Sequence, residues 1–135
     1  MVLFLAISAL LARFLSLPNV ERDDLVSLLQ AQADGDAPAM LSQLSGCSAS
    51  PTCTEQVRAN AAKLKRHGEV KILTLTSPTA YSLTSATGTT RVAWTVLGKL
   101  PVVQCVKVRR TGNALTGFTL ALLSIGPQIE GEADC

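Results

Sequence analysis

Residues 89–110 read TTRVAWTVLGKLPVVQCVKVRR, and this stretch decides the fold. On both sides of Gly98, apolar residues alternate with polar ones, which is the period of a half-buried β-strand. Connections this short join antiparallel strands. The same alternation recurs through most of the C-terminal half. We therefore predict an antiparallel meander of four to five strands, near residues 69–76, 79–87, 89–97, 101–110 and 114–125.

The register follows if residues 98–100 and 111–113 each form a three-residue turn. Trp94 then pairs with Gln104, and Val106 pairs with Phe118. A slip by one residue would mix apolar and charged side chains on each face, so the pattern selects this alignment. The predicted inner face holds Val92, Trp94, Val96, Val102, Val106, Val108, Phe118, Leu120 and Leu122. The predicted outer face holds Arg91, Thr95, Lys107, Arg109 and Thr119.

Helical spacing dominates the residues before the strands. Apolar residues recur at this spacing from Glu21 to Leu44, with Asn19 as a candidate N-cap and a break at 33–38. A second helix is expected from about Thr52 to Arg66, because residues 52–55 match a capping box and a glycine follows at position 68. These helices must cover the apolar side of the sheet. The predicted fold class is α+β, with N-terminal helices packed on one face of a curved antiparallel sheet.

Residues 1–18 are apolar except for a few positions, and Arg13 is their only charge. A run of this length is typical of a signal-peptide core or a buried helix, since a bilayer needs about 20 apolar residues. One interpretation is a membrane anchor or signal-derived helix; the alternative is an amphipathic helix packed on the domain. Residues 19–135 then form a single cone-like α+β domain.

The amino-acid composition excludes some classes of protein. The chain has 135 residues, 47% of them hydrophobic and only 16% charged, with a net charge of +2. This favours one globular domain over intrinsic disorder. Five aromatic residues (three Phe, one Trp, one Tyr) are too few for a stacking platform, so we expect no nucleic-acid partner.

Four cysteines in a short chain with an apolar N-terminus indicate two disulfides and an oxidising compartment. Cys47 and Cys53 bound a tight loop, so we pair them. Cys105 falls on the outer face, which the last ten residues can retrace, so we pair it with Cys135; a free Cys135 on a frayed terminus stays open. Zinc bound by the first pair with His67 is the weaker interpretation, because the spacing exceeds the usual two to four residues.

The sequence LVSLLQAQADGD at residues 25–36, followed by the strands, resembles the opening helix of the nuclear transport factor two-like (cystatin-like cone) superfamily. In particular, the chain is similar to small membrane-tethered extracytoplasmic members, the mammalian-cell-entry-associated and lumazine-binding-like domains. The resemblance implies a cavity between helices and sheet, in which enzymatic members place a carboxylate or histidine. No third helix is evident between the early strands, so the cone is expected to be shallow or open.

The residues argue against catalysis. No Asp or Glu occurs between Val70 and Ile129, so the strands provide no general base. Only a helix acid or His67 can take that role, and His67 follows a basic helix end, where a solvated side chain is the more frequent case. No nucleophile elbow or phosphate loop is present. We lean towards a non-enzyme and expect no cofactor and no metal.

Two features suggest binding. Tyr81, Trp94 and Gln104 are candidate ligand contacts on the inner face, unless Gln104 is satisfied by hydrogen bonds inside a filled core. Arg91, Lys107 and Arg109 are candidate partner contacts, unless they are simply solvated. We expect a non-catalytic binding or scaffolding domain of a cell-envelope assembly, secreted or held at the membrane by its N-terminal segment. The alternatives are a small-molecule binder or degenerate enzyme of the same superfamily, taking a small apolar ligand, or a structural subunit whose first helix packs into a larger complex.

Overall fold

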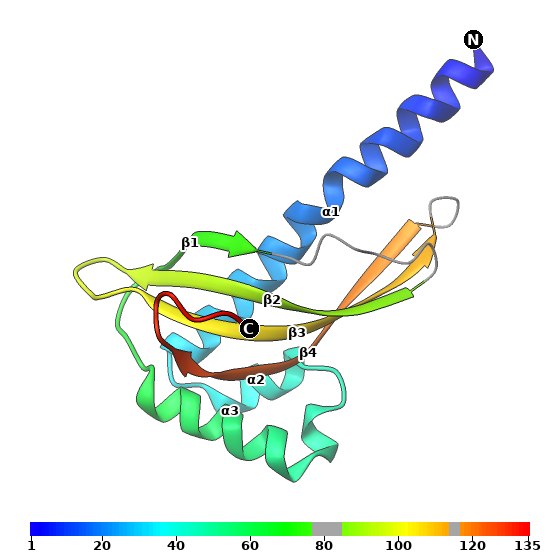
Figure 1. Cartoon of the computed structure of the whole chain (residues 1–135). Helices are drawn as coiled ribbons and strands as arrows, with labels where there is room; N and C mark the ends of the chain where they lie inside the picture. The colour runs from blue at the N-terminus through cyan, green and yellow to red at the C-terminus, as the bar shows by residue number, and fades with distance from the viewer. Residues whose placement is uncertain (77–84, 114–116) are drawn as a thin grey trace.

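The computed structural model describes residues 1–76, 85–113 and 117–135, and only the backbone for 13–20, 85–86, 113 and 117–118. Helices come first and strands follow (Figure 1). The helices are α1 (Val2–Ala33), α2 (Ala37–Gln43), the short 3-10 helix η1 (Cys47–Ala49) and α3 (Pro51–Lys63). The strands are β1 (Val70–Thr76), β2 (Ser85–Val96), β3 (Val102–Asn113) and β4 (Gly117–Ile129).

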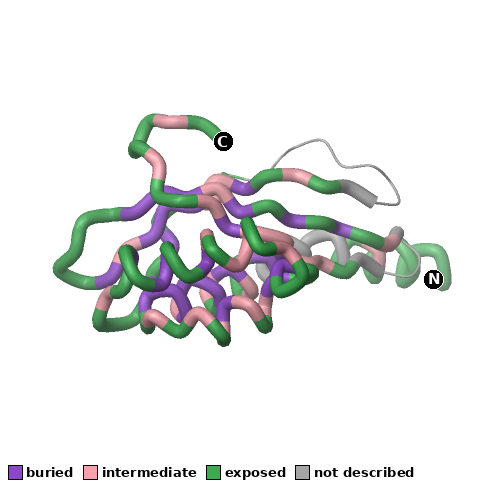
Figure 2. Tube along the Cα trace, turned by 90° about the horizontal axis from the view of Figure 1, so that it is seen from below, coloured by how far each residue is buried: buried purple, intermediate pink, exposed green. Residues whose placement is uncertain are grey.

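The described strands form one open antiparallel sheet in the order β1-β2-β3-β4, so the predicted meander is confirmed. The helices lie against one face of this sheet, and the C-terminal tail lies on the other side (Figure 2). The α+β fold class predicted from the alternation of apolar residues is therefore correct. Tyr81 lies outside the described residues, as does the segment 77–84 that was expected to begin a separate strand.

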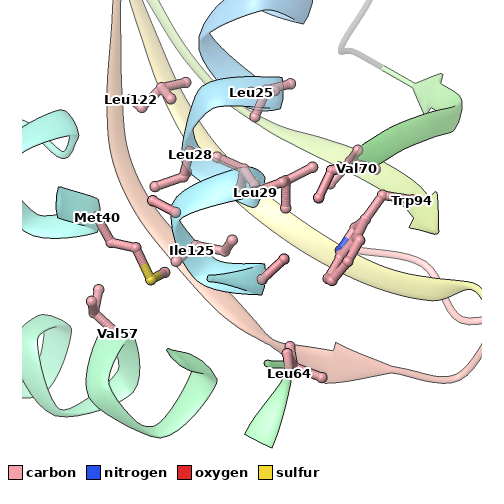
Figure 3. Close-up of a cluster of buried hydrophobic side chains, with 14 of the residues drawn as sticks. Leu25, Leu28, Leu29, Met40, Val57, Leu64, Val70, Trp94, Leu122 and Ile125 are labelled. Atoms are coloured by element: carbon pink, nitrogen blue, oxygen red, sulfur yellow. The ribbon is translucent and has the colours of Figure 1, made fainter. Parts of the chain in front are cut away.

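The core fills the space between the helices and the sheet (Figure 3). From α1, Leu25, Leu28 and Leu29 are fully buried at the helical spacing that the sequence shows. They belong to the same buried cluster as Trp94 of β2, and α2 and α3 complete the far side of the core (Figure 3). All the predicted inner-face residues whose side chains are described are buried, apart from the half-buried Leu120.

Two irregularities in the β3–β4 pairing bend the end of β4. The register shifts between Lys107 and Val108 and again between Gln104 and Val106. As a result both Leu122 and Ile125 are buried, although they are three residues apart and a regular strand would point them to opposite faces. The bulges therefore keep the apolar side chains of β4 on the helix-covered face.

The predicted strand registers pair the wrong residues, but they place each side chain on the correct face of the sheet. Trp94 pairs with Val102, two residues from the predicted partner, because the β2–β3 connection runs from 97 to 101. Residues 111–113 belong to β3, and Gly112 pairs with Phe118. Both errors shift the β3 partner by an even number of residues. An even shift preserves the face of each side chain, so the two predicted faces survive.

The helix boundaries also differ from the prediction. Helix α1 runs unbroken through residues 18 and 19, so Asn19 is not an N-cap. The apolar residues ahead of it continue the same helix, and no new helix start is needed there. Helix α3 begins at Pro51 and is capped by Ser50, whose side chain accepts from the Cys53 N–H at 3.3 Å, rather than by the predicted box at Thr52. It ends at Lys63, before the expected Arg66.

Candidate functional site

The N-terminal end of α1 projects away from the rest of the molecule (Figure 1). Residues 2–12 contain no charge, and their side chains are exposed or nearly so. Phe4 is 74% exposed and Leu5 is 67% exposed. The alternative in which this segment packs on the domain is therefore wrong for residues 1–12. Such a segment is unusual, because a helix that is apolar on all sides is normally buried in protein or membrane.

Within the described residues, no helix combines the length and the apolar character that crossing a membrane requires. Residues 2–12 alone span about 16 Å of helix, roughly half of the hydrocarbon thickness.

A buried charged cluster joins α1 to the sheet. Glu21 is 1% exposed, and its carboxylate forms an ion pair with Arg110 of β3. The Thr90 hydroxyl of β2 donates to the other carboxylate oxygen at 2.7 Å. Glu21 is thus a helix acid on the inner side of the sheet. The sequence left a helix acid as one of the two possible general bases, because the strands carry no acids. The Glu21 oxygens are engaged by a cation and a hydroxyl, an arrangement that holds α1 on the sheet.

The inner-face candidates Trp94 and Gln104 are brought together. The Trp94 indole N–H and the Gln32 amide both donate to Gln104 Oε1 at 2.8 Å. The Gln104 amide nitrogen in turn donates to Gln32 Oε1 and to the Gly126 carbonyl, both at 3.0 Å. Gln104 therefore uses its full hydrogen-bonding capacity inside the protein, as the filled-core interpretation requires. A ligand role for the pair stays a prediction.

The outer-face candidates have different environments. Lys107 and Arg109 are exposed, whereas Arg91 is half-buried. The Arg91 guanidinium donates to the carbonyls of Ala133, at 2.9 Å, and of Gly131. It therefore holds the C-terminal tail against the sheet, a local task that the sequence prediction did not assign to it.

Both predicted disulfides are present. Cys47 is bonded to Cys53 at the η1–α3 junction, and Cys105 of β3 is bonded to Cys135. Because Cys47 and Cys53 are bonded to each other, neither is available as a thiolate ligand, and the zinc interpretation is wrong. Two bonded pairs are compatible with an oxidising compartment outside the cytoplasm.

A cationic hollow lies at the end of the molecule remote from the N-terminus. We call it the basic recess; its volume is about 490 Å³, and its wall includes Lys65, Arg66, His67, Lys99, Leu100 and Pro101. Three of these residues follow α3 and three belong to the β2–β3 connection. The sequence pattern points to His67 only as a possible catalytic, zinc-binding or solvated residue, and it does not indicate that the two segments meet.

A second hollow, of about 400 Å³, lies between α1, the α2 end and β4. Asp24 lines it, together with Ser42 and Gln43. Burial, and secondarily the neighbouring charge of Asp23, raises the pKa of Asp24 above its usual value. Among the described residues that line this hollow, Asp24 is the only charged one.

No family model, curated protein or solved structure matches this chain. The resemblance to the nuclear transport factor two-like superfamily therefore stays a prediction.

Proposed function

We propose that this protein is a non-catalytic binding or scaffolding domain of the cell envelope, held at a membrane outside the cytoplasm by the N-terminal end of α1. The observation that carries this proposal is the exposure of residues 2–12. Six large apolar side chains, Val2, Leu3, Phe4, Leu5, Ile7 and Leu11, lie in water. Moving most of this surface into lipid is worth roughly 10 kcal/mol, at about 1.5–3 kcal/mol for each side chain.

The rest of the molecule fits a module that presents surfaces. Apolar side chains fill the interior, and Trp94, Gln104 and Gln32 are hydrogen-bonded to one another there. These contacts therefore do not favour the alternative in which Trp94 and Gln104 bind a ligand. Two disulfides fit an oxidising compartment. The Glu21–Arg110 pair anchors α1 to the sheet, so the projecting end and the folded body share one continuous helix.

Flotation with uncharged phosphatidylcholine vesicles tests the proposal. The full chain should float with the vesicles, and the double variant Leu5→Glu/Leu11→Glu should stay in the dense fraction, because two carboxylates would have to enter lipid. The matched control is Leu97→Glu/Leu100→Glu, which alters two comparably exposed leucines at the other end of the molecule and should float. Equal flotation of both variants, or none of the wild type, would contradict the membrane role.

Disulfide mapping tests the compartment independently. Protein isolated from its native source with thiols blocked at lysis should yield the linked peptides Cys47–Cys53 and Cys105–Cys135. Four free thiols would place the domain in a reducing compartment and overturn the extracytoplasmic assignment.

A further inference from the structure

We propose that the basic recess binds an acidic segment of a partner protein, in which carboxylates alternate with apolar side chains. The inference adds a partner chemistry to the proposed function and depends on it only for the orientation of the site. The carboxylates would meet Lys65, Arg66 and Lys99, and the apolar side chains would meet the β2–β3 connection.

The cations of the recess have no acidic partners among the described residues. No carboxylate of the described residues lies within 4.0 Å of the Lys65 or Lys99 ammonium group. No Asp or Glu of the described chain lines the recess either. Lys65, Arg66 and Lys99 bring three positive charges to the wall of one hollow, where they repel one another, and an anionic ligand would relieve that repulsion.

The Arg66 guanidinium and the stem of Lys65 already contact the protein. Arg66 donates through Nη1 to the Lys65 carbonyl at 2.9 Å, and its backbone N–H donates to the Ala33 carbonyl at 2.8 Å. The Lys65 stem lies against the Gly35 turn so closely that an added Cβ there would be 3.0 Å from its Cδ. A site whose donors are held before binding loses less side-chain entropy when the ligand arrives.

Two exposed leucines lie on the β2–β3 connection, which also carries Lys99. Leu97 is 93% exposed and Leu100 is 86% exposed, on a connection that Gly98 turns with a φ of +80°. Charged and apolar contacts side by side suit a peptide that carries both kinds of side chain better than a small inorganic anion.

The position of the recess favours a protein over the anchoring bilayer. The Arg66 backbone N–H is hydrogen-bonded to the carbonyl of Ala33, the last residue of α1, so the recess lies at that end of the helix. Ala33 lies 21 positions after Ala12 in the helix, which separates the recess from the exposed apolar segment by about 30 Å. The β2–β3 connection, which lines part of the recess, lies at the opposite end of the molecule from the N-terminus (Figure 1). A domain anchored by residues 2–12 would thus hold the recess away from the headgroups of its own membrane.

Fluorescence anisotropy with the full chain in a non-ionic detergent tests the site. The probe is a dye-labelled octapeptide of alternating glutamate and leucine, and its negative control replaces glutamate by glutamine. Lys65→Gln/Lys99→Gln should weaken binding of the acidic probe at least tenfold. The matched variant Arg58→Gln/Lys71→Gln removes two exposed cations outside the recess and should change it less than twofold. Raising NaCl from 50 to 500 mM should weaken wild-type binding several-fold.

Three outcomes would overturn the inference. The acidic probe does not bind, both double variants lose affinity equally, or the glutamine peptide binds as well as the acidic one. A second measurement compares flotation on vesicles with and without phosphatidylserine; if Lys65→Gln/Lys99→Gln abolishes a preference for phosphatidylserine, the recess binds lipid headgroups instead. Peptide binding in detergent and flotation on phosphatidylcholine are separate readouts, so failure of the recess and failure of the membrane role are distinguishable.

Discussion

The two ends of α1 are built from similar apolar residues and have opposite environments. Leu25, Leu28 and Leu29 are fully buried between the sheet and the other helices, whereas residues 2–12 lie in solvent. The buried end carries acids and amides between its leucines, and these polar side chains select one face. The exposed end carries none, so no face is selected. An amphipathic pattern is thus what docks this helix on its own domain, and its absence leaves residues 2–12 for another apolar environment.

The largest expected effect comes from the ion pair at the start of the buried end. Glu21→Ala removes the buried carboxylate that contacts Arg110 and Thr90, and it should lower the free energy of unfolding by about 3–5 kcal/mol. Urea denaturation followed by circular dichroism measures the change.

The double variant Glu21→Met/Arg110→Met separates charge from packing. Replacing both ions by apolar side chains should restore most of the lost stability, because a buried pair contributes little net stabilisation over apolar packing. If Glu21→Ala proves as stable as the wild type, the pair does not hold α1 on the sheet and the two ends of the helix differ less than the structure indicates.

A leucine at each end of α1 gives the next largest effect. Leu28→Ala should cost about 2–5 kcal/mol, because it opens a cavity at a fully buried site. Leu5→Ala removes the same atoms from an exposed site and should change the free energy of unfolding by no more than about 0.5 kcal/mol. Both values come from urea denaturation in the same non-ionic detergent. Similar losses for the two variants would mean that residues 2–12 pack on the domain in solution.

The sequence predicts the two faces of the sheet better than its register. Alternation has a period of two, so it survives shifts of the β3 partner by even numbers of residues. Turn lengths depend on local geometry that the pattern does not encode. The β2–β3 connection, for example, is closed by the Lys99 N–H donating to the Val96 carbonyl at 3.0 Å. The bulges that bury Ile125 likewise arise from pairing between distant segments.

The charged cluster was missed although its signal is present in the sequence. Glu21 precedes Leu25, Leu28 and Leu29 by four, seven and eight residues, which places it on their face of α1. Arg110 continues the even-numbered series of inner-face residues in β3. Charged residues are usually solvent-exposed, so the pattern alone does not indicate that these two are buried. The basic recess is different: nothing in the sequence shows that residues 65–67 and 99–101 meet, because only the folded sheet brings them together.

The smallest expected effect on stability comes from Asp24, which is only half-buried although it lies in the buried part of α1. Burial, and then Asp23, raises the pKa of the half-buried Asp24 in the folded protein. A carboxyl whose pKa is raised on folding favours the folded state while it is protonated, and this contribution is lost as the pH rises through the folded pKa. Asp24→Asn should therefore stabilise the protein at pH 7, by no more than about 0.5 kcal/mol.

The advantage of Asp24→Asn should vanish below about pH 3, where the aspartate is protonated in both the folded and the unfolded state. Thermal denaturation at the two pH values measures it. Asp23→Asn should act in the same direction but more weakly, because the charge of Asp23 is the smaller cause of the shift. Glu132→Gln, in the exposed tail, controls for the loss of one negative charge. If Asp24→Asn destabilised the protein at pH 7, the ionised carboxylate would be making a favourable contact in the folded protein. Asp24 would then help to hold α1 on the domain, as Glu21 does.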